Sequence, residues 1–447
     1  MPLAKPLPMP ILTDELHCHL YGCLTPEDLW SLGRDRWRSL EPRLAWYSAE
    51  YEKTYGRRPT PSDYWLKDSG LELLRKDFLF TTPGPFSRFQ ASFNLAIALL
   101  PITPDDTVVL SHVLKGQRGS GLSYGEYRCF VPALLTPDQI AAYLATMADK
   151  TLELAAECDP TFKPRLIFSL SRIPATGLTQ YRLLKDCLRA KPDRAKVVTG
   201  IDFCGVEEGH PPSLTAPLIA QIIADNSADR SQALALLYHV GESFTDKTLM
   251  SAARWVWQAH QMGAHRLGHA LALGLDPEVY RGRQATESVR ERRDHLQWLQ
   301  HSKPWLKERG YEVDSARLAF ELNKTAGAGL DDTWTCSYDD EVIADCRCLQ
   351  QALIADLADK NAIIESCPTS NMLIGQLTPA SHPLPRFTKA GLRVVIGADD
   401  PGIFATSLAG EEKILRTSFG WSEIMLLQSQ ELARQSRAES LVGSVGT

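Results

Sequence analysis

The chain has 447 residues, of which 44% are hydrophobic and 23% are charged. This composition is typical of a globular protein and excludes fibrous, disordered and membrane-embedded classes. The 48 Lys and Arg residues stand against 54 Asp and Glu residues, giving a formal net charge of −6. We therefore expect neither a nucleic acid polymer nor a membrane surface as a partner, although a local basic pocket stays open.

The start of the chain and its cysteines indicate where in the cell the protein is expected. The start of the chain combines one lysine with four prolines and has no apolar core, which is not the pattern of a signal peptide. The ten cysteines form no Cys-x-x-Cys pair, which indicates reduced thiols and a cytoplasmic location. Cys346 and Cys348, with Cys336 upstream, leave a second metal site open, although their spacing is unusual for zinc.

Short apolar runs that end in polar residues alternate with helical stretches, a pattern typical of βα units and a parallel sheet. The predicted strands are Ile11–Leu20, Leu122–Val131, Arg165–Leu170, Ala195–Phe203, Leu234–Val240, His265–His269, Ala362–Ser366 and Arg393–Ile396. Helices are predicted at Pro137–Cys158, Pro217–Ala224 and Asp246–Met262. Eight parallel strands indicate an α/β fold of the closed (β/α)₈ TIM barrel type.

The length exceeds the roughly 250 residues at which one hydrophobic core usually stops growing, so it fits two domains or one large barrel with insertions. Two intervals are too long for simple connections: residues 29–121, rich in aromatic residues, and residues 274–360, which include the charged helical run Glu287–Arg309. Neither is rich enough in Gly and Ser to be a flexible linker. We expect one barrel domain over residues 1–447, with helical insertions after strands 1 and 6 that also offer surfaces for a homo-oligomer.

Polar residues with metal-binding chemistry end several predicted strands. His17 and His19 close the first strand, and the period of two places both imidazoles on the same face. Three later strands end in further candidates, which are His239, His269 and the pair Asp399 and Asp400. In a (β/α)₈ barrel these carboxyl-terminal ends converge on one mouth, where active sites are built.

Three imidazoles and one carboxylate suit a divalent ion of the zinc type with an open position for water, whose pKa the ion lowers to roughly 7. Hydrolysis also requires proton transfer. Glu242, three residues after His239, is placed to donate a proton, while His269 and the second carboxylate can orient or deprotonate the water. A carboxylate favoured by a helix dipole is the alternative interpretation of Glu242. His265 begins a strand at the opposite end of the barrel and is left out of the site.

Six segments in order resemble the motifs of the adenosine/AMP deaminase family of metal-dependent hydrolases, in the amidohydrolase superfamily. They are Glu15-Leu-His-Cys-His-Leu-Tyr-Gly22, Gly200-Ile-Asp-Phe-Cys-Gly205, His239-Val-Gly-Glu242, Leu267-Gly-His269, Cys367-Pro-Thr-Ser-Asn371 and Asp399-Asp-Pro401. The resemblance implies hydrolytic deamination at C6 of an adenine ring, with ammonia as the second product. It also implies one zinc ion per chain, held by His17, His19, His239 and Asp399.

The resemblance assigns roles around the purine as well. Glu242 matches the residue that protonates N1, and His269 resembles the histidine that positions the zinc-bound hydroxide. Asp400 resembles the carboxylate near N7, and Gly205 matches the glycine whose backbone approaches N3, where a side chain would obstruct. An apolar lid that excludes water is the role implied for Phe86, Phe89 and Phe93, although simple core packing is the alternative.

One departure concerns the substrate. The nucleoside deaminases carry an Asp two residues after the second histidine, where this chain has Tyr21. A carboxylate there would repel a 5′-phosphate and Tyr would not, so AMP, dAMP or an N6-substituted AMP joins adenosine and deoxyadenosine as a candidate substrate. The candidate phosphate-binding cations are Arg172, Lys67, Arg75 and Lys76, each of which is also compatible with a solvated surface.

Other functions stay open. The nearest is deamination of another amino-substituted ring, such as an N6-modified purine, a pterin or a triazine. A non-catalytic nucleotide-binding or assembly component is a different class, against which the occupied ligand positions argue. A polynucleotide substrate is disfavoured because those zinc deaminases use His/Cys/Cys ligands with Pro-Cys-x-x-Cys spacing. A free nucleobase would leave Tyr21 and the insertions without an evident role.

Overall fold

The protein is described from a computed structural model, in which residues 10–99, 107–132, 135–157 and 161–443 are described. Eight parallel strands form one sheet in the order β1-β2-β3-β4-β5-β6-β9-β10. Their bounds are β1 (Asp14–His19), β2 (Tyr124–Phe130), β3 (Lys163–Ser169), β4 (Val198–Asp202), β5 (Ala235–Val240), β6 (Arg266–His269), β9 (Ile363–Ser366) and β10 (Arg393–Ile396). The predicted (β/α)₈ barrel is confirmed.

The barrel is closed at one point, between β1 and the residues that follow β10. The backbone N–H of His19 donates to the carbonyl of Asp399 at 2.8 Å, and the N–H of Asp399 donates to the carbonyl of His17 at 2.8 Å. The closure therefore passes through three residues of the predicted metal site, which couples the position of these side chains to the closing of the sheet.

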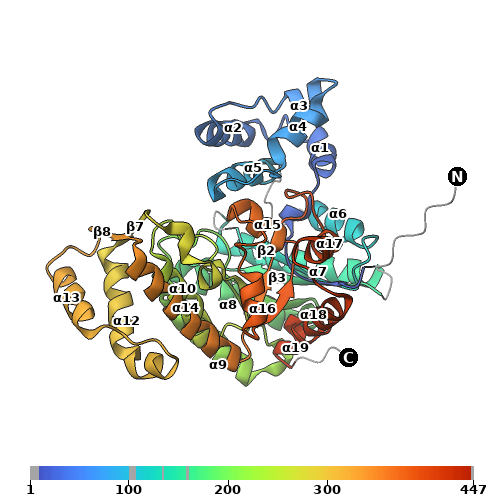
Figure 1. Cartoon of the computed structure of the whole chain (residues 1–447). Helices are drawn as coiled ribbons and strands as arrows, with labels where there is room; N and C mark the ends of the chain where they lie inside the picture. Colours follow the sequence, from blue (N-terminus) through green and yellow to red (C-terminus); the bar gives the residue numbers. More distant parts are fainter. Residues whose placement is uncertain (1–9, 100–106, 133–134, 158–160, 444–447) are drawn as a thin grey trace.

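Helices surround the barrel (Figure 1). The helices between and after the strands are α7 (Pro137–Glu157), α8 (Pro174–Ala190), α9 (Ala216–Ala228), α10 (Leu249–Gln261), α11 (Leu271–Gly274), α15 (Pro368–Ile374), α16 (Leu384–Lys389), α17 (Leu408–Ser418), α18 (Glu423–Gln435) and α19 (Ala438–Leu441). The predicted end of α7, Cys158, lies outside the described residues. Helix α10 begins later than predicted because Thr248 caps it, its side chain accepting from the N–H of Ser251. The predicted strand start at Ala195 is wrong, since Pro192–Lys196 forms a 3-10 helix.

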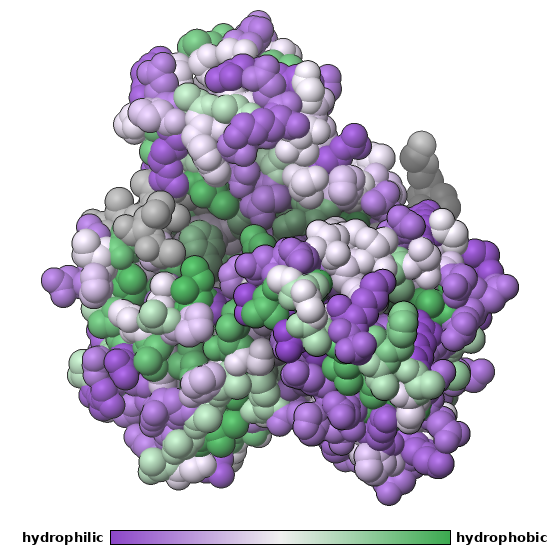
Figure 2. Space-filling model, turned by 90° about the vertical axis from the view of Figure 1, so that its left-hand side faces the viewer, coloured by the Kyte–Doolittle hydropathy of each residue, from purple (hydrophilic) through white to green (hydrophobic). Residues whose placement is uncertain are grey.

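The segment between β1 and β2 forms a lobe that stands above the barrel in Figures 1 and 2. Its helices are α1 (Pro26–Arg34), α2 (Glu41–Tyr55), α3 (Asp63–Leu66), α4 (Gly70–Phe78) and α5 (Phe86–Leu99), whereas α6 (Val108–Gln117), at the end of the segment, lies beside the barrel and packs against α7. Buried tyrosines fill the lobe, and the Tyr64 hydroxyl donates to Asp77 Oδ2 at 2.6 Å. Figure 1 places α5 on the side of the lobe that faces the barrel, so α5 is the helix positioned to cover the barrel mouth.

The segment between β6 and β9 contains α12 (Val289–Glu308), α13 (Ser315–Ala326) and α14 (Asp340–Asp359). It also contains a feature that the sequence analysis did not predict, an antiparallel ribbon of β7 (Gln284–Ser288) and β8 (Thr333–Ser337). The ribbon strands are short and half exposed, so they lack the apolar run by which the barrel strands were recognised. None of the described helices is both long and apolar enough to cross a membrane.

Candidate metal centre and active site

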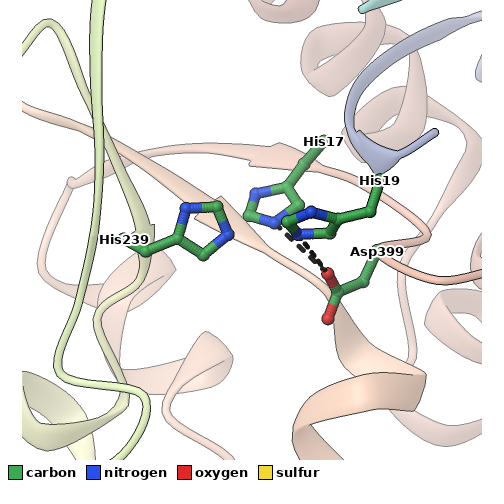
Figure 3. A group of neighbouring side chains, drawn as sticks. All are labelled: His17, His19, His239 and Asp399. Carbon is green, nitrogen blue, oxygen red and sulfur yellow. Dashed lines mark ion pairs between the residues drawn. The ribbon is translucent and has the colours of Figure 1, made fainter. Parts of the chain in front are cut away.

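Three imidazoles and a carboxylate meet at the carboxyl-terminal mouth of the barrel (Figure 3). His17 and His19 lie on β1, His239 lies on β5, and Asp399 follows β10. One ligand atom from each of the four lies within 4.8 Å of the others. Asp399 Oδ1 is 3.4 Å from His17 Nε2 and 3.2 Å from His19 Nε2. The four predicted ligands are therefore brought together from three strands that are far apart in the sequence.

The donor atoms fit a bound divalent ion. The Nε2 atoms of His17 and His239 are buried and have no hydrogen-bond partner within the described part of the chain. A buried polar atom without a hydrogen-bond partner destabilises the folded state. Two imidazole nitrogens that each present a lone pair cannot form a hydrogen bond with each other. A zinc-type ion would satisfy them and, when bound, would polarise the attacking water.

The other nitrogen of each of these histidines is held by a carboxylate. His17 Nδ1 is 2.6 Å from Glu365 Oε2, and His239 Nδ1 is 2.8 Å from Asp202 Oδ2. A carboxylate at Nδ1 keeps the proton on that nitrogen and turns the Nε2 lone pair toward the metal position. Burial lowers the pKa of His239 to about 4, so its ring is neutral near pH 7 and able to bind a metal.

A buried charge network links these two carboxylates. Arg128 Nε is 2.9 Å from Asp202 Oδ2, and its Nη2 contacts Glu365. Arg266 Nε is 2.7 Å from Glu365 Oε1, while its Nη2 contacts Glu126. All five side chains are fully buried. Burial alone would raise the pKa of Asp202, but His239 and Arg128 hold it well below its usual value, so this carboxylate stays ionised.

This network was not predicted from the sequence, although Asp202 lies inside the segment Gly200-Ile-Asp-Phe-Cys-Gly205. A signal was present, because Arg128, Arg266 and Glu365 are charged residues inside strands predicted to be buried. A charged side chain on a strand that is covered on both faces must be paired with an opposite charge. Charged residues at such positions therefore indicate a network of ion pairs beneath the site.

The backbone at the barrel mouth has an unusual conformation at two of the candidate site residues. His269 and Asp399 both have φ of 62°, in the left-handed region that residues with a Cβ rarely adopt. Such strain costs about 1–3 kcal/mol and is concentrated at functional sites. Gly22 makes room for a neighbouring carboxylate, since a Cβ at this position would lie 1.7 Å from Asp400 Oδ1.

Glu242 and His269 lie close together beside the candidate metal ligands. The amide nitrogen of Asn371 lies 3.0 Å from His269 Nδ1, and because an amide nitrogen donates, Nδ1 accepts. The proton of the neutral ring then lies on Nε2, which is 3.6 Å from Glu242 Oε2. Burial, together with the charges of Asp399 and Glu207, raises the pKa of Glu242 well above its usual value. A carboxyl group that stays protonated near neutral pH can act as a general acid.

Glu242 and His269 line a pocket of about 250 Å³, whose lining also includes Gly205, Cys204 and Asp400. Burial and the adjacent Asp399 raise the pKa of Asp400 well above its usual value, so it too can donate a hydrogen bond. Gly205 has φ of 87°, and no atom of the described residues lies within 4 Å of the position of a Cβ, so a side chain there would extend into open space. This placement is compatible with a close approach of a ring to the Gly205 backbone.

One face of α5 forms the roof of the pocket. Phe86, Phe89, Gln90, Phe93 and Ile97 all line it, at the spacing of a single helical face. Phe89 and Phe404 stack with ring centroids 5.3 Å apart, which ties the roof to the loop after β10. The three predicted lid phenylalanines therefore line the same pocket as the candidate metal ligands and also make packing contacts.

Two predicted substrate residues lie outside this pocket lining. The Tyr21 side chain is buried against Phe130, and its hydroxyl is 3.3 Å from the hydroxyl of Tyr143. The Arg172 guanidinium donates to the carbonyl oxygens of Phe203 and His239, at 2.7 Å each. Arg172 is therefore placed to support the backbone at the end of β5, at the candidate metal ligand His239.

The remaining candidate cations lie in the lobe. Lys67 pairs with Asp63 at 2.7 Å, Arg75 pairs with Glu27 and Glu72, and Lys76 is exposed on α4. None of the described residues that line the pocket is a Lys or an Arg. Likewise, neither group of potential metal ligands found among the described residues includes Cys336, Cys346 or Cys348.

A (β/α)₈ barrel with three His residues and one Asp gathered at its strand ends is the arrangement expected of a metal-dependent hydrolase. Residues 332–442 match the family model of adenosine deaminase. An adenine deaminase of Rhizobium leguminosarum bv. trifolii is 35% identical over 129 residues, which cover 26% of this chain and 40% of the relative. The chain thus matches less than half of the length of this relative. These matches confirm the resemblance to the adenosine/AMP deaminase family.

Solved structures share the fold over nearly the whole chain. The adenine deaminase from Arthrobacter aurescens has a TM-score of 0.56 at 16% identity, covering 98% of this chain and 98% of its own. The N6-mAMP deaminase of arabidopsis has a TM-score of 0.54 at 16% identity, covering 96% and 93%. The barrel and its additions therefore follow an architecture found in deaminases.

Proposed function

We propose that the protein is a zinc-dependent hydrolase that deaminates an adenine nucleoside or nucleotide to the inosine-type product and ammonia. The observation that carries the proposal is the convergence of the four candidate ligands with Glu242 and His269 at one pocket. The names of the matched relatives support an adenine-type ring as the substrate. We also propose that the chain is a single domain, since one apolar core joins the lobe, the barrel and the ribbon segment.

In this proposal His17, His19, His239 and Asp399 hold the ion, which supplies an activated water when bound. Protonated Glu242 donates to N1 of the ring and makes C6 more electrophilic. Neutral His269, fixed by Asn371, orients the attacking water. The phenylalanines of α5 exclude bulk water from the reacting atoms.

A second candidate is deamination of the free base adenine. One observation favours it over a nucleotide substrate, which is that the described lining of the pocket offers no Lys or Arg to a 5′-phosphate. In addition, the hydroxyl of Tyr21 is directed to Tyr143 instead of to the pocket. The Rhizobium leguminosarum relative quoted above is also named for adenine.

The test follows the loss of adenine absorbance across adenine, adenosine, deoxyadenosine, AMP and dAMP, with and without a chelator. We expect turnover of at least one of these compounds, its loss with the chelator, and its return when zinc is added. Zinc-loaded protein that turns over none of them would contradict the proposal. A preference for a monophosphate would support the role proposed for Tyr21, whereas a preference for adenine would support the second candidate.

Glu242→Gln isolates the proton donor. We expect kcat/KM to fall by about 10²–10⁴-fold, the usual contribution of general acid catalysis, with zinc content unchanged. Glu278→Gln is the matched control, because its carboxylate is exposed and pairs only with surface arginines among the described residues. If Glu242→Ala abolishes turnover but leaves the biological effect of the protein intact, its role is that of a non-catalytic binding component.

A further inference from the structure

The turn that follows β5 carries the candidate proton donor, and a carboxylate from the neighbouring loop holds it. Glu207, which follows β4, is buried beside this turn. Its Oε1 accepts from the N–H of Gly241 at 2.8 Å, and its Oε2 accepts from the N–H groups of Glu242 and Ser243 at 3.2 and 3.4 Å. Successive backbone N–H groups thus converge on one carboxylate, an arrangement by which backbone turns bind anions.

The turn can present these N–H groups because of the residue with which it begins. Gly241 has φ of 73°, in the left-handed region, and a Cβ at this position would lie 2.6 Å from Cγ2 of Val256. Glycine is the residue that fits both this conformation and this space. The shape of the turn is therefore set by Gly241 within it and by Glu207 against it.

Arg172 holds the same stretch of backbone at its start. Its Nη2 donates to the carbonyl oxygens of Phe203 and His239 at 2.7 Å each, and its side chain is buried. Hydrogen bonds to charged groups are stronger than those between neutral groups. The backbone that joins the candidate metal ligand His239 to Glu242 therefore has a cation on a carbonyl and an anion on the N–H groups that follow.

Further contacts join the loops after β4 and β5. Glu208 accepts from the hydroxyl groups of Ser243 and Thr245, and Asp246 accepts from the N–H of Gly209 at 2.8 Å. The two loops therefore form one hydrogen-bonded unit at the barrel mouth. Of the three carboxylates in these contacts, that of Glu207 is the one bonded to the backbone of Glu242 itself.

The position of Glu242 depends on this turn. Its Oε2 lies 3.6 Å from Nε2 of His269, and both residues line the metal pocket. A shift of the turn would carry the Glu242 carboxyl group with it, and a displacement of about 1 Å at a reacting group can lower turnover by about 10²-fold. Burial of a carboxylate destabilises the fold unless the charge is well paired, so a carboxylate in this place suggests a role beyond packing.

We propose that Glu207 is a positioning residue, which fixes the turn 241–243 so that the Glu242 carboxyl group stays beside His269 in the metal pocket. The inference rests on the proposed function, in which Glu242 donates the proton. Glu207 is not among the described residues that line the pocket, so it is assigned no contact with substrate. Loss of its carboxylate should therefore slow the chemical step while zinc content stays unchanged.

The experiment is a double-mutant cycle on the zinc-loaded full-length protein with its preferred adenine compound. It compares the wild type, Glu207→Gln, Glu242→Gln and the double variant. Gln keeps the shape of Glu but has a single acceptor oxygen, so the N–H of Gly241 or those of Glu242 and Ser243 lose their acceptor. We expect kcat and kcat/KM of Glu207→Gln to fall together by about 10–100-fold, since a displaced proton donor weakens the transition state.

The Glu242→Gln background separates positioning from general stability. There Glu207→Gln is expected to change kcat/KM by no more than about twofold, because the side chain that it positions no longer carries the transferable proton. A Glu207 that only stabilises the fold would lower kcat/KM by the same factor in both backgrounds. Equal factors, or a wild-type kcat for Glu207→Gln, overturn the proposal and leave the deaminase function intact. A wild-type protein that turns over no adenine compound refutes the deaminase function, and this proposal with it.

Two more variants complete the test. Glu412→Gln is the matched control, since Glu412 is also buried and its Oε2 accepts from the N–H groups of Ile11 and Leu12 at 2.7 and 3.0 Å, outside the pocket lining. We expect it to lose stability in urea without a fall in kcat. Glu207→Asp keeps the charge but is one methylene shorter, and it takes the place of Glu207→Gln in the cycle if that variant does not fold. The same comparison of the two backgrounds then decides.

Discussion

The substitution Glu365→Gln tests whether the buried charge network supports the metal site. Glu365 is fully buried, with Oε2 2.6 Å from His17 Nδ1 and Oε1 2.7 Å from Arg266 Nε, and it also contacts Arg128. Gln keeps the shape, but it removes the charge and turns an amide donor toward groups that are themselves donors. At least one buried donor is thereby left without an acceptor.

The expected loss in unfolding free energy depends on the ion pairs that remain after the substitution. After the substitution Arg128 still pairs with Asp202 and Arg266 still pairs with Glu126, so neither guanidinium is left entirely alone. We therefore expect the loss in unfolding free energy to lie at the lower end of the range for a broken buried pair, about 3 kcal/mol. Because His17 loses the carboxylate that orients it, zinc affinity should fall by about 10–100-fold.

The assay measures urea unfolding of the apo protein and zinc affinity by competition with a chelator. Glu72→Gln is the control, since Glu72 is 68% exposed and pairs with Arg75 on the surface, where a lost pair costs at most about 1 kcal/mol. A Glu365→Gln protein with wild-type zinc affinity and a stability loss below about 1 kcal/mol would refute the role assigned to the network.

Two further predictions concern the site and its surroundings. Gly22→Ala should displace the Asp400 carboxylate, which lies 1.7 Å from the new Cβ, and lower kcat/KM by about 10²-fold with the fold retained by circular dichroism. Burial raises the pKa of Glu411 to about 7 from 4.5, so the native state keeps a proton that the unfolded state loses. Wild-type stability relative to Glu411→Gln should therefore be highest below pH 4.5 and decrease as the pH rises to about 7, and urea unfolding across this range checks the sign.

The alternation of short apolar runs with helical stretches was sufficient to locate the strands of the barrel. Each of the eight predicted strands overlaps an observed one, and β10 agrees at both ends. The boundary at Ala195 failed because a proline-led 3-10 turn precedes β4, a local choice that apolar content does not reveal. The ribbon of β7 and β8 was missed since its strands, half exposed, carry little of the hydrophobic pattern on which strand prediction depends.

The sequence by itself determined which residues are available for chemistry. The spacing of His17 and His19 and the polar ends of β5 and β10 predicted a group of ligands that the structure brings within 4.8 Å of one another. That inference succeeds because barrel topology sends every strand end to the same mouth, so position along a strand implies position in space.

Only the tertiary structure decided what each side chain faces. Tyr21 packs against Phe130 and Arg172 supports backbone carbonyls, although their places in the sequence suggested contact with substrate. The pairing of Glu365 with His17 likewise joins residues 348 positions apart. Such contacts depend on the twist of the barrel and on which cavity the inserted segments leave open. The surplus length of this 447-residue chain thus forms a lobe above the barrel mouth and a segment with an antiparallel ribbon between β6 and β9.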